Sequence, residues 1–180
     1  MICGLVEGLL AGVISDTHDN MALARRAASL FRDAGVDVVI HLGDVIAPFT
    51  LSALISEIPG IKTYLVFGNN DGERRGLAAV MAAGGGEALE PPAQLSLAGR
   101  RLLLLHGFGG PEETVEIVDA LASGGRWDAV LYGHTHEARV DYIKGRLILN
   151  PGDGGGVLNK PTAALLDLES LRARLVSLEG

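Results

Sequence analysis

Cysteine is almost absent from the chain, and aromatic residues are scarce. A single cysteine, Cys3, cannot form an internal disulfide, so nothing in the sequence indicates an oxidising compartment. A small buried hydrophobe near the start of the chain is favoured over a catalytic thiol for this residue. Aromatic side chains make up 4% of the residues, so alanine, leucine, valine and glycine must fill the core instead.

The chain also lacks an excess of basic residues and a long apolar run. Its net charge of −7 argues against general nucleic-acid binding, which needs a basic face to displace counterions from phosphates. The first fourteen residues are mostly apolar, but Glu7 interrupts them and no Lys or Arg precedes the run. Neither a signal peptide nor a membrane helix is therefore predicted. We expect a cytoplasmic protein without membrane contact.

A regular alternation of strands and helices fills the first half of the chain. Its length of 180 residues suits one domain over residues 1–180. Hydrophobic spacing predicts strands over 9–15, 36–42 and 61–67, and helices over 21–34, 48–58 and 73–83. This βαβαβα order implies a parallel sheet with covering helices.

The second half of the chain is predicted to be mostly β-structure. One helix is expected over 112–123, and strands over 94–97, 101–106, 129–132, 139–143, 146–150, 162–167 and 172–178. So many strands in one domain favour an α/β fold in which two sheets pack together with helices outside. The glycine-rich stretch 152–156 suggests a mobile loop.

Polar residues cluster where the apolar strands end. Ligands bind at the carboxyl ends of strands in open parallel α/β sheets, so five separate segments would deliver their side chains to one crevice. Residues two apart in extended chain also point the same way. The polar side chains at these strand ends are Asp16, His18, Asp44, Asn69, Asn70, Asp71, His106, His134, Thr135 and His136.

This set of side chains has a definite chemical use. Carboxylate oxygen, amide oxygen and neutral imidazole nitrogen bind Mn²⁺, Fe²⁺, Ni²⁺ and Zn²⁺, and the absence of thiolates argues against a structural zinc site. The alternative is that Asp and Asn at strand ends only form turns and helix caps. That alternative explains why Asp19 and Asn20 are present, and it explains part of the role of Asp71. It does not explain the histidines.

The order of the motifs along the chain resembles that of a known family. Their ordered series, spread over residues 11–153, resembles that of the calcineurin-like metallophosphoesterases, and most of all the small stand-alone archaeal and bacterial phosphodiesterases of that superfamily. The motifs are Asp16-x-His18, Gly43-Asp44, Gly68-Asn69-x-Asp71, His106-Gly107 and Gly133-His134-x-His136. The resemblance implies a two-sheet sandwich flanked by helices, in four layers of αββα order.

The resemblance also implies a hydrolase with a dinuclear metal centre. One metal would be held by Asp16, His18 and His136, the other by Asn69, His106 and His134. Asp44 would bridge the two ions, and a hydroxide shared between them would attack phosphorus. Two divalent cations are expected as cofactors, with manganese favoured and nickel, iron or zinc as alternatives. The expected substrate is a small phosphodiester.

Three positions depart from the family pattern or stay open. Asn70 stands where many monoesterases have histidine, and it is the one candidate catalytic residue. An amide can donate a hydrogen bond but cannot give up a proton, which favours diesters with good leaving groups. Asp153 stands where serine is usual, after Asn150-Pro151-Gly152, and whether it faces the site is open. For His41, inside an apolar strand, a hydrogen-bonded core role is favoured over one beside Asp44.

A second hypothesis comes from another functional class. The retromer subunit that resembles this family keeps the fold but works by binding protein partners. A non-catalytic scaffold would not need to keep all seven ligand positions, so the complete set favours an enzyme. The sequence leaves the oligomeric state open, a homo-oligomer included.

Overall fold

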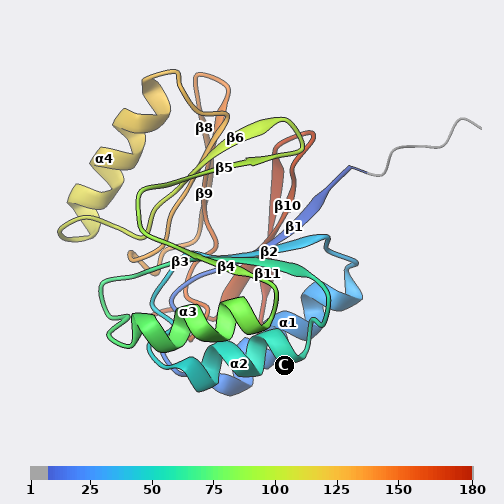
Figure 1. The fold of residues 1–180 in the computed structure, drawn as a ribbon. Coiled ribbons are helices and arrows are strands. Elements are labelled where there is room, and N and C mark those ends of the chain that lie inside the picture. The colour runs from blue at the N-terminus through green and yellow to red at the C-terminus, as the bar shows by residue number, and fades with distance from the viewer. Residues whose placement is uncertain (1–7, 180) are drawn as a thin grey trace, which may run out of the picture.

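The fold consists of two β-sheets packed face to face, with helices on both outer sides (Figure 1). The computed structural model describes residues 8–179, so Cys3 and the prediction made for it lie outside the described residues. The six strands of the first sheet are β1 (Leu10–Ile14), β2 (Val38–His41), β3 (Lys62–Val66), β4 (Glu87–Leu89), β10 (Thr162–Asp167) and β11 (Arg172–Ser177). The five strands of the second are β5 (Ala93–Leu97), β6 (Arg100–Leu104), β7 (Ala129–Leu131), β8 (Arg139–Ile143) and β9 (Arg146–Asn150).

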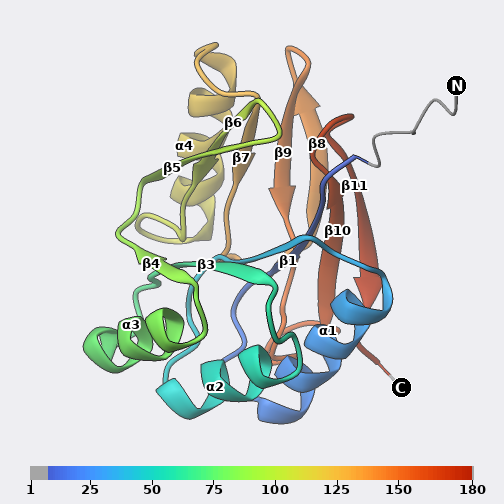
Figure 2. The same ribbon diagram turned by 45° about the vertical axis from the view of Figure 1, so that its right-hand side comes forward.

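Four helices of the described chain cover these sheets. They are α1 (Met21–Asp33), α2 (Pro48–Ser56), α3 (Arg74–Ala83) and α4 (Pro111–Ser123). Helices α1, α2 and α3 lie together outside the first sheet, and α4 lies outside the second (Figure 2). The four-layer αββα arrangement expected from the sequence is therefore confirmed. No helix within residues 8–179 is both long enough and apolar enough to cross a membrane.

The order of the strands explains where the crevice forms. The first sheet runs β11-β10-β1-β2-β3-β4, and β1 to β4 are parallel neighbours. The second runs β5-β6-β7-β9-β8, with β6, β7 and β9 parallel. The carboxyl ends of parallel strands lie at one edge of a sheet, so the loops after them share that edge.

Two features of the first sheet were not predicted. Strand β4 has only three residues after a glycine run, too few for a clear hydrophobic pattern. Strands β10 and β11 cross from the end of the chain to the first sheet, where β10 pairs antiparallel with β1 and Leu10 lies opposite Asp167. A pairing between such distant segments leaves no local trace in the sequence.

Alternating side chains divide the core into layers. In β6, Leu102 and Leu104 point into the cluster between the two sheets. Leu103 and the following Leu105 point the other way, into the cluster beneath α4. This period of two is the pattern of a strand that is buried on both faces. The interior between the sheets therefore needs aliphatic residues in almost every strand, which accounts for the low aromatic content.

Removing side-chain volume between the sheets should destabilise the whole fold. Leu104 is fully buried there, whereas Leu158 is 71% exposed on a loop. We expect Leu104→Ala to lower the free energy of unfolding by about 2–5 kcal/mol, because the truncation leaves a cavity. Leu158→Ala should change it by less than about 0.5 kcal/mol. Urea denaturation of both variants measures this, and equal effects would contradict the layer assignment.

Candidate metal centre

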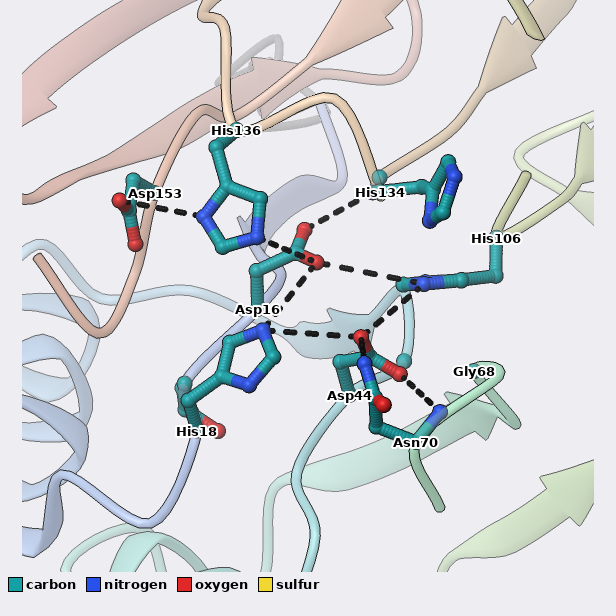
Figure 3. Close-up of polar contacts among 12 residues, drawn as sticks. Asp16, His18, Asp44, Gly68, Asn70, His106, His134, His136 and Asp153 are labelled. Carbon is teal, nitrogen blue, oxygen red and sulfur yellow. Dashed lines mark hydrogen bonds and ion pairs between the residues drawn. The ribbon is translucent and has the colours of Figure 1, made fainter. Parts of the chain in front are cut away.

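Loops that follow four strands bring five of the seven candidate ligands to one place (Figure 3). Asp16 and His18 follow β1, and Asp44 follows β2. His106 follows β6, and His136 follows β7. Their metal-binding atoms form two groups that share Asp16. Within each group, all the ligand atoms lie within 4.8 Å of one another. The first group adds His18 and His136, and the second adds Asp44 and His106.

The two carboxylates lie between the imidazoles. Asp44 Oδ2 is 3.5 Å from His18 Nε2 and 3.4 Å from His106 Nε2. Asp16 Oδ1 is 3.6 Å from His136 Nε2, 3.8 Å from His18 Nε2 and 4.0 Å from His106 Nε2. The nitrogens of three histidines thus face two carboxylate oxygens at distances longer than hydrogen bonds, an arrangement that leaves room for cations between them.

His134 and Asn69 lie at the edge of this cluster. The ring of His134 is edge-on to that of His106, with centroids 5.2 Å apart, and its Nε2 is 2.9 Å from the carbonyl oxygen of Gly109. Its backbone N–H donates to Asp16 Oδ2 at 3.0 Å. Asn69 Oδ1 is 3.0 Å from His106 Nε2. Neither side chain reaches the two carboxylates directly.

The buried carboxylates of the cluster have histidine neighbours but no Lys or Arg partner among residues 8–179. Asp16 and Asp44 are at most 1% exposed, and no Lys or Arg within residues 8–179 pairs with either. Asp16 Oδ1 and His18 Nε2 are buried and lack a hydrogen-bond partner among these residues. Buried charges in proteins are normally paired or coordinate metals. The residues therefore fit a pair of divalent cations, because the free atoms are those that a cation would contact.

Backbone strain accompanies the cluster. Five of the seven candidate ligands have φ between 39° and 69°, a region that costs most non-glycine residues energy: Asp16, His18, Asp44, His134 and His136. Two glycines allow the loops to approach so closely. A Cβ on Gly68 would lie 2.1 Å from Asp44 Oδ1, and one on Gly133 would lie 2.0 Å from Ser15 Oγ. Both positions exclude any side chain.

Asp71 holds two of the loops together. Its carboxylate accepts hydrogen bonds from the backbone N–H groups of Gly68 at 2.7 Å, Asp44 at 3.0 Å and Ile46 at 2.9 Å. The side chain is buried, so these three bonds replace the water that it loses. These bonds agree with the turn-forming role that was expected to account for part of the function of Asp71. The sequence did not reveal that the residue also fixes the Asp44 loop.

Asn70 contacts Asp44 twice. Its backbone N–H donates to Asp44 Oδ1 at 2.9 Å, and its Nδ2 donates to Oδ2 at 2.7 Å. Burial alone would raise the pKa of Asp44, but contacts with His106 and Asn70 outweigh burial and lower the pKa well below its usual range. Asp44 therefore stays ionised, as a metal ligand must.

Two of the histidines hold protons more tightly than usual. The Asp16 carboxylate is the main reason that the pKa of His18 is raised. Burial opposes protonation of His106, but Asp44 and Asp16 outweigh it and raise the pKa of that residue as well. Because metals bind neutral imidazole, protons compete with cations here, and metal affinity should fall as the pH is lowered.

Asp153 lies behind His136, on the side of the ring away from Asp16, which settles where this residue stands relative to the site. Asp153 Oδ2 lies 3.1 Å from His136 Nδ1, and the residue is fully buried. The mobile loop suggested over 152–156 is instead packed in place. Gly154 and Gly155 donate backbone hydrogen bonds of 2.9 Å to the carbonyls of Ser15 and Asp16. The serine-to-aspartate departure was the only signal that could have drawn attention to Asp153.

His41 is a buried, hydrogen-bonded residue, as favoured from the sequence. Its Nδ1 accepts from the backbone N–H of Gly43 at 3.2 Å, and its Nε2 is 3.1 Å from Thr17 Oγ1. Burial lowers the pKa of His41 to about 4, although nearby acidic groups act in the opposite direction. The ring thus supports the Asp16 and Asp44 loops from behind in its neutral form.

This lowered pKa has a consequence for stability in metal-free protein. Between the ordinary value of 6.5 and about 4, an unfolded chain takes up a proton at His41 that the folded chain refuses. The free energy of unfolding should therefore fall as the pH is lowered through this window. We expect His41→Gln to remove that part of the slope, as measured by denaturant unfolding across the window. The same slope in both proteins would contradict the assignment.

Comparison with known proteins gives the family. Residues 9–171 match the model of a calcineurin-like phosphoesterase superfamily domain. Phosphodiesterase MJ0936 of Methanocaldococcus jannaschii is 31% identical over 172 residues, which cover 93% of this chain and 98% of that protein. A solved structure described as a novel archaeal phosphodiesterase superposes with a TM-score of 0.82 at 29% identity, covering 94% of this chain and 99% of that one.

A second solved structure shares the fold. Vps29 from Chaetomium thermophilum superposes with a TM-score of 0.68 at 20% identity, covering 93% of this chain and 86% of that one. At that identity the likeness concerns the fold alone. The family assignment comes from the family model and the archaeal relative. The chain belongs to the calcineurin-like phosphoesterase superfamily.

Proposed function

We propose that this protein is a metal-dependent phosphodiesterase that acts on small phosphodiesters through a dinuclear metal centre. The observation that carries the proposal is the pair of buried carboxylates, Asp16 and Asp44, which face three imidazoles and have no Lys or Arg partner within residues 8–179. The names of MJ0936 and of the archaeal phosphodiesterase of known structure support the diesterase part.

The proposed ligands divide into two sets that share Asp44. Asp16, His18 and His136 would hold one cation, as their clustering supports. Asn69, His106 and His134 would hold the other. Because His134 Nε2 is engaged by the Gly109 carbonyl, Nδ1 is the nitrogen that His134 has free for a metal. Asp44 Oδ2 would bridge, which its similar distances to His18 and His106 support.

The chemistry follows from this donor set. When bound, two divalent cations lower the pKa of water so that a hydroxide can attack phosphorus, and they offset charge on the phosphoryl oxygens. Asp16 and Asp44 supply two negative charges against four positive ones, so the loaded site would still attract an anionic diester. Asn70, at the exposed side of Asp44, would donate a hydrogen bond to the leaving oxygen without transferring a proton.

The proposal also covers the identity of the metal, the size of the substrate and the location of the protein. Manganese is the favoured metal, because this mixture of oxygen and nitrogen ligands suits it, with nickel, iron and zinc as alternatives. The acidic net charge supports a small substrate over a nucleic acid. The cytoplasm is the proposed location.

The competing function is a non-catalytic scaffold on the same fold. The fold likeness to Vps29 is the observation in its favour. Burying two carboxylates without Lys or Arg partners is costly, however, and a scaffold gains nothing from that cost. The cluster therefore favours the enzyme.

The two functions differ in a direct assay. Metal-stripped protein, re-supplied with Mn²⁺, Ni²⁺ or Zn²⁺, is incubated with an activated aryl phosphodiester and with the matching monoester. We expect metal-dependent cleavage of the diester and little cleavage of the monoester, because Asn70 cannot protonate a poor leaving group. Absence of both activities, with metal bound, would favour the scaffold.

A variant of one ligand provides the control for that assay. His134→Ala should reduce diester turnover at least about a hundredfold, because the loss of a direct ligand should cost no less than the loss of an outer-shell partner. The fold should persist, since His134 lies at the partly exposed edge of the cluster. Circular dichroism checks the fold. Unchanged turnover would remove His134 from the ligand set.

The role of Asn70 has its own test. We expect Asn70→His to raise kcat/KM for the monoester by at least about tenfold, because an imidazole can donate a proton to the leaving oxygen. Diester turnover should persist in the variant. Steady-state kinetics on both substrates measures the change. A variant that still cleaves the diester and gains nothing on the monoester would take Asn70 out of the specificity argument.

A further inference from the structure

A carboxylate stands directly behind one of the proposed ligands. We propose that Asp153 is a positioning residue that fixes the tautomer and orientation of His136 and raises the affinity of the centre for metal. The proposal rests on the metal centre proposed above. It concerns a residue in which this chain departs from the serine usual in the family.

The geometry favours one tautomer of His136. His136 Nδ1 is 3.1 Å from Asp153 Oδ2, and His136 Nε2 is 3.6 Å from Asp16 Oδ1 (Figure 3). No hydrogen bond to His136 Nδ1 is formed by any other group among residues 8–179, and an ionised carboxylate can only accept, so the contact with Asp153 favours hydrogen on Nδ1. Nε2 of the neutral ring then directs its lone pair toward Asp16, where the cation would lie.

Asp153 is itself held firmly. Its Oδ2 accepts backbone hydrogen bonds from Leu158 at 2.6 Å and Asn159 at 2.9 Å. The side-chain amide of Asn159 in turn donates to the carbonyl oxygen of His136 at 3.1 Å. One loop thus holds the ring of His136 through Asp153 and its backbone through Asn159, so the ring has little freedom to turn.

A merely structural role for Asp153 would explain less. Closing the loop accounts for the two amide hydrogen bonds, but it does not require the same oxygen to face the ring of His136. Asp153 is fully buried, its Oδ1 lacks a hydrogen-bond partner among residues 8–179, and no Lys or Arg there pairs with it. It adds a third buried negative charge beside Asp16 and Asp44, which favours bound cations. A serine hydroxyl would supply neither the charge nor the reach.

The first test uses the unmodified protein. Metal-free protein with ¹⁵N-labelled histidine is studied by long-range ¹H–¹⁵N correlation at a pH where the imidazole is neutral. The His136 signals are assigned by their loss in His136→Asn. We expect hydrogen on Nδ1, the opposite of the Nε2–H form that free histidine prefers. Hydrogen on Nε2 of His136 would overturn the proposal without any variant of Asp153.

The second test measures metal affinity and needs no hydrolysis. Asp153→Ser should weaken Mn²⁺ binding about 10–100-fold and release the tautomer of His136. Asp153→Asn keeps an acceptor but loses the charge, so its affinity should lie between those of wild type and Asp153→Ser. Asp33→Asn, on the exposed end of α1, is the matched control and should bind as wild type does.

The outcomes of this second test are separable. Isothermal titration gives the affinities, and thermal unfolding checks the fold. If Asp153→Ser does not fold, the nearly isosteric Asp153→Asn decides. Wild-type affinity in a folded Asp153→Asn, with an unchanged tautomer, would overturn the proposal. A protein that shows the expected tautomer and affinity loss but cleaves no diester would contradict the proposed function alone.

Discussion

The structure depends on negative charge that is buried without a Lys or Arg partner within residues 8–179. Asp16, Asp44 and Asp153 are each at most 1% exposed. Their carboxylates contact the rings of His18, His106 and His136, which lie between them. Like charges at such depth repel, and desolvation adds to the cost, so cations bound among them would stabilise the arrangement. The strained backbone of the same loops fits this account, because strain of this kind is tolerated where function requires it.

The rest of the fold holds these charges in place. The two aliphatic sheets form a rigid base, and the carboxyl ends of their parallel strands meet at one edge. Buried polar side chains then fix the loops: Asp71 through three backbone N–H groups, and His41 through Gly43 and Thr17. The positions of the ligands are therefore set by residues that do not themselves face the crevice.

Much of this could be predicted from the sequence, because its signals are local. Hydrophobic periodicity located the helices and all the strands except β4, and the motifs at strand ends brought out the candidate ligands. The pairing of β10 with β1 could not be predicted, since it joins segments far apart in the chain. Nor could the place of Asp153, because its position behind His136 depends on how the 153–159 loop folds back. The edge position of His134, with Nε2 turned to Gly109, likewise depends on the conformation of another loop.

The central claim is that two cations compensate the buried carboxylates, and metal stoichiometry tests it most directly. Metal-stripped protein is loaded with Mn²⁺, and bound metal per chain is measured by elemental analysis. Electron paramagnetic resonance reports whether the ions are coupled. The account predicts two coupled ions per chain, and loss of the coupling in Asp44→Asn. Fewer than one ion per chain in folded wild-type protein, or two uncoupled ions that Asp44→Asn leaves unchanged, would contradict it.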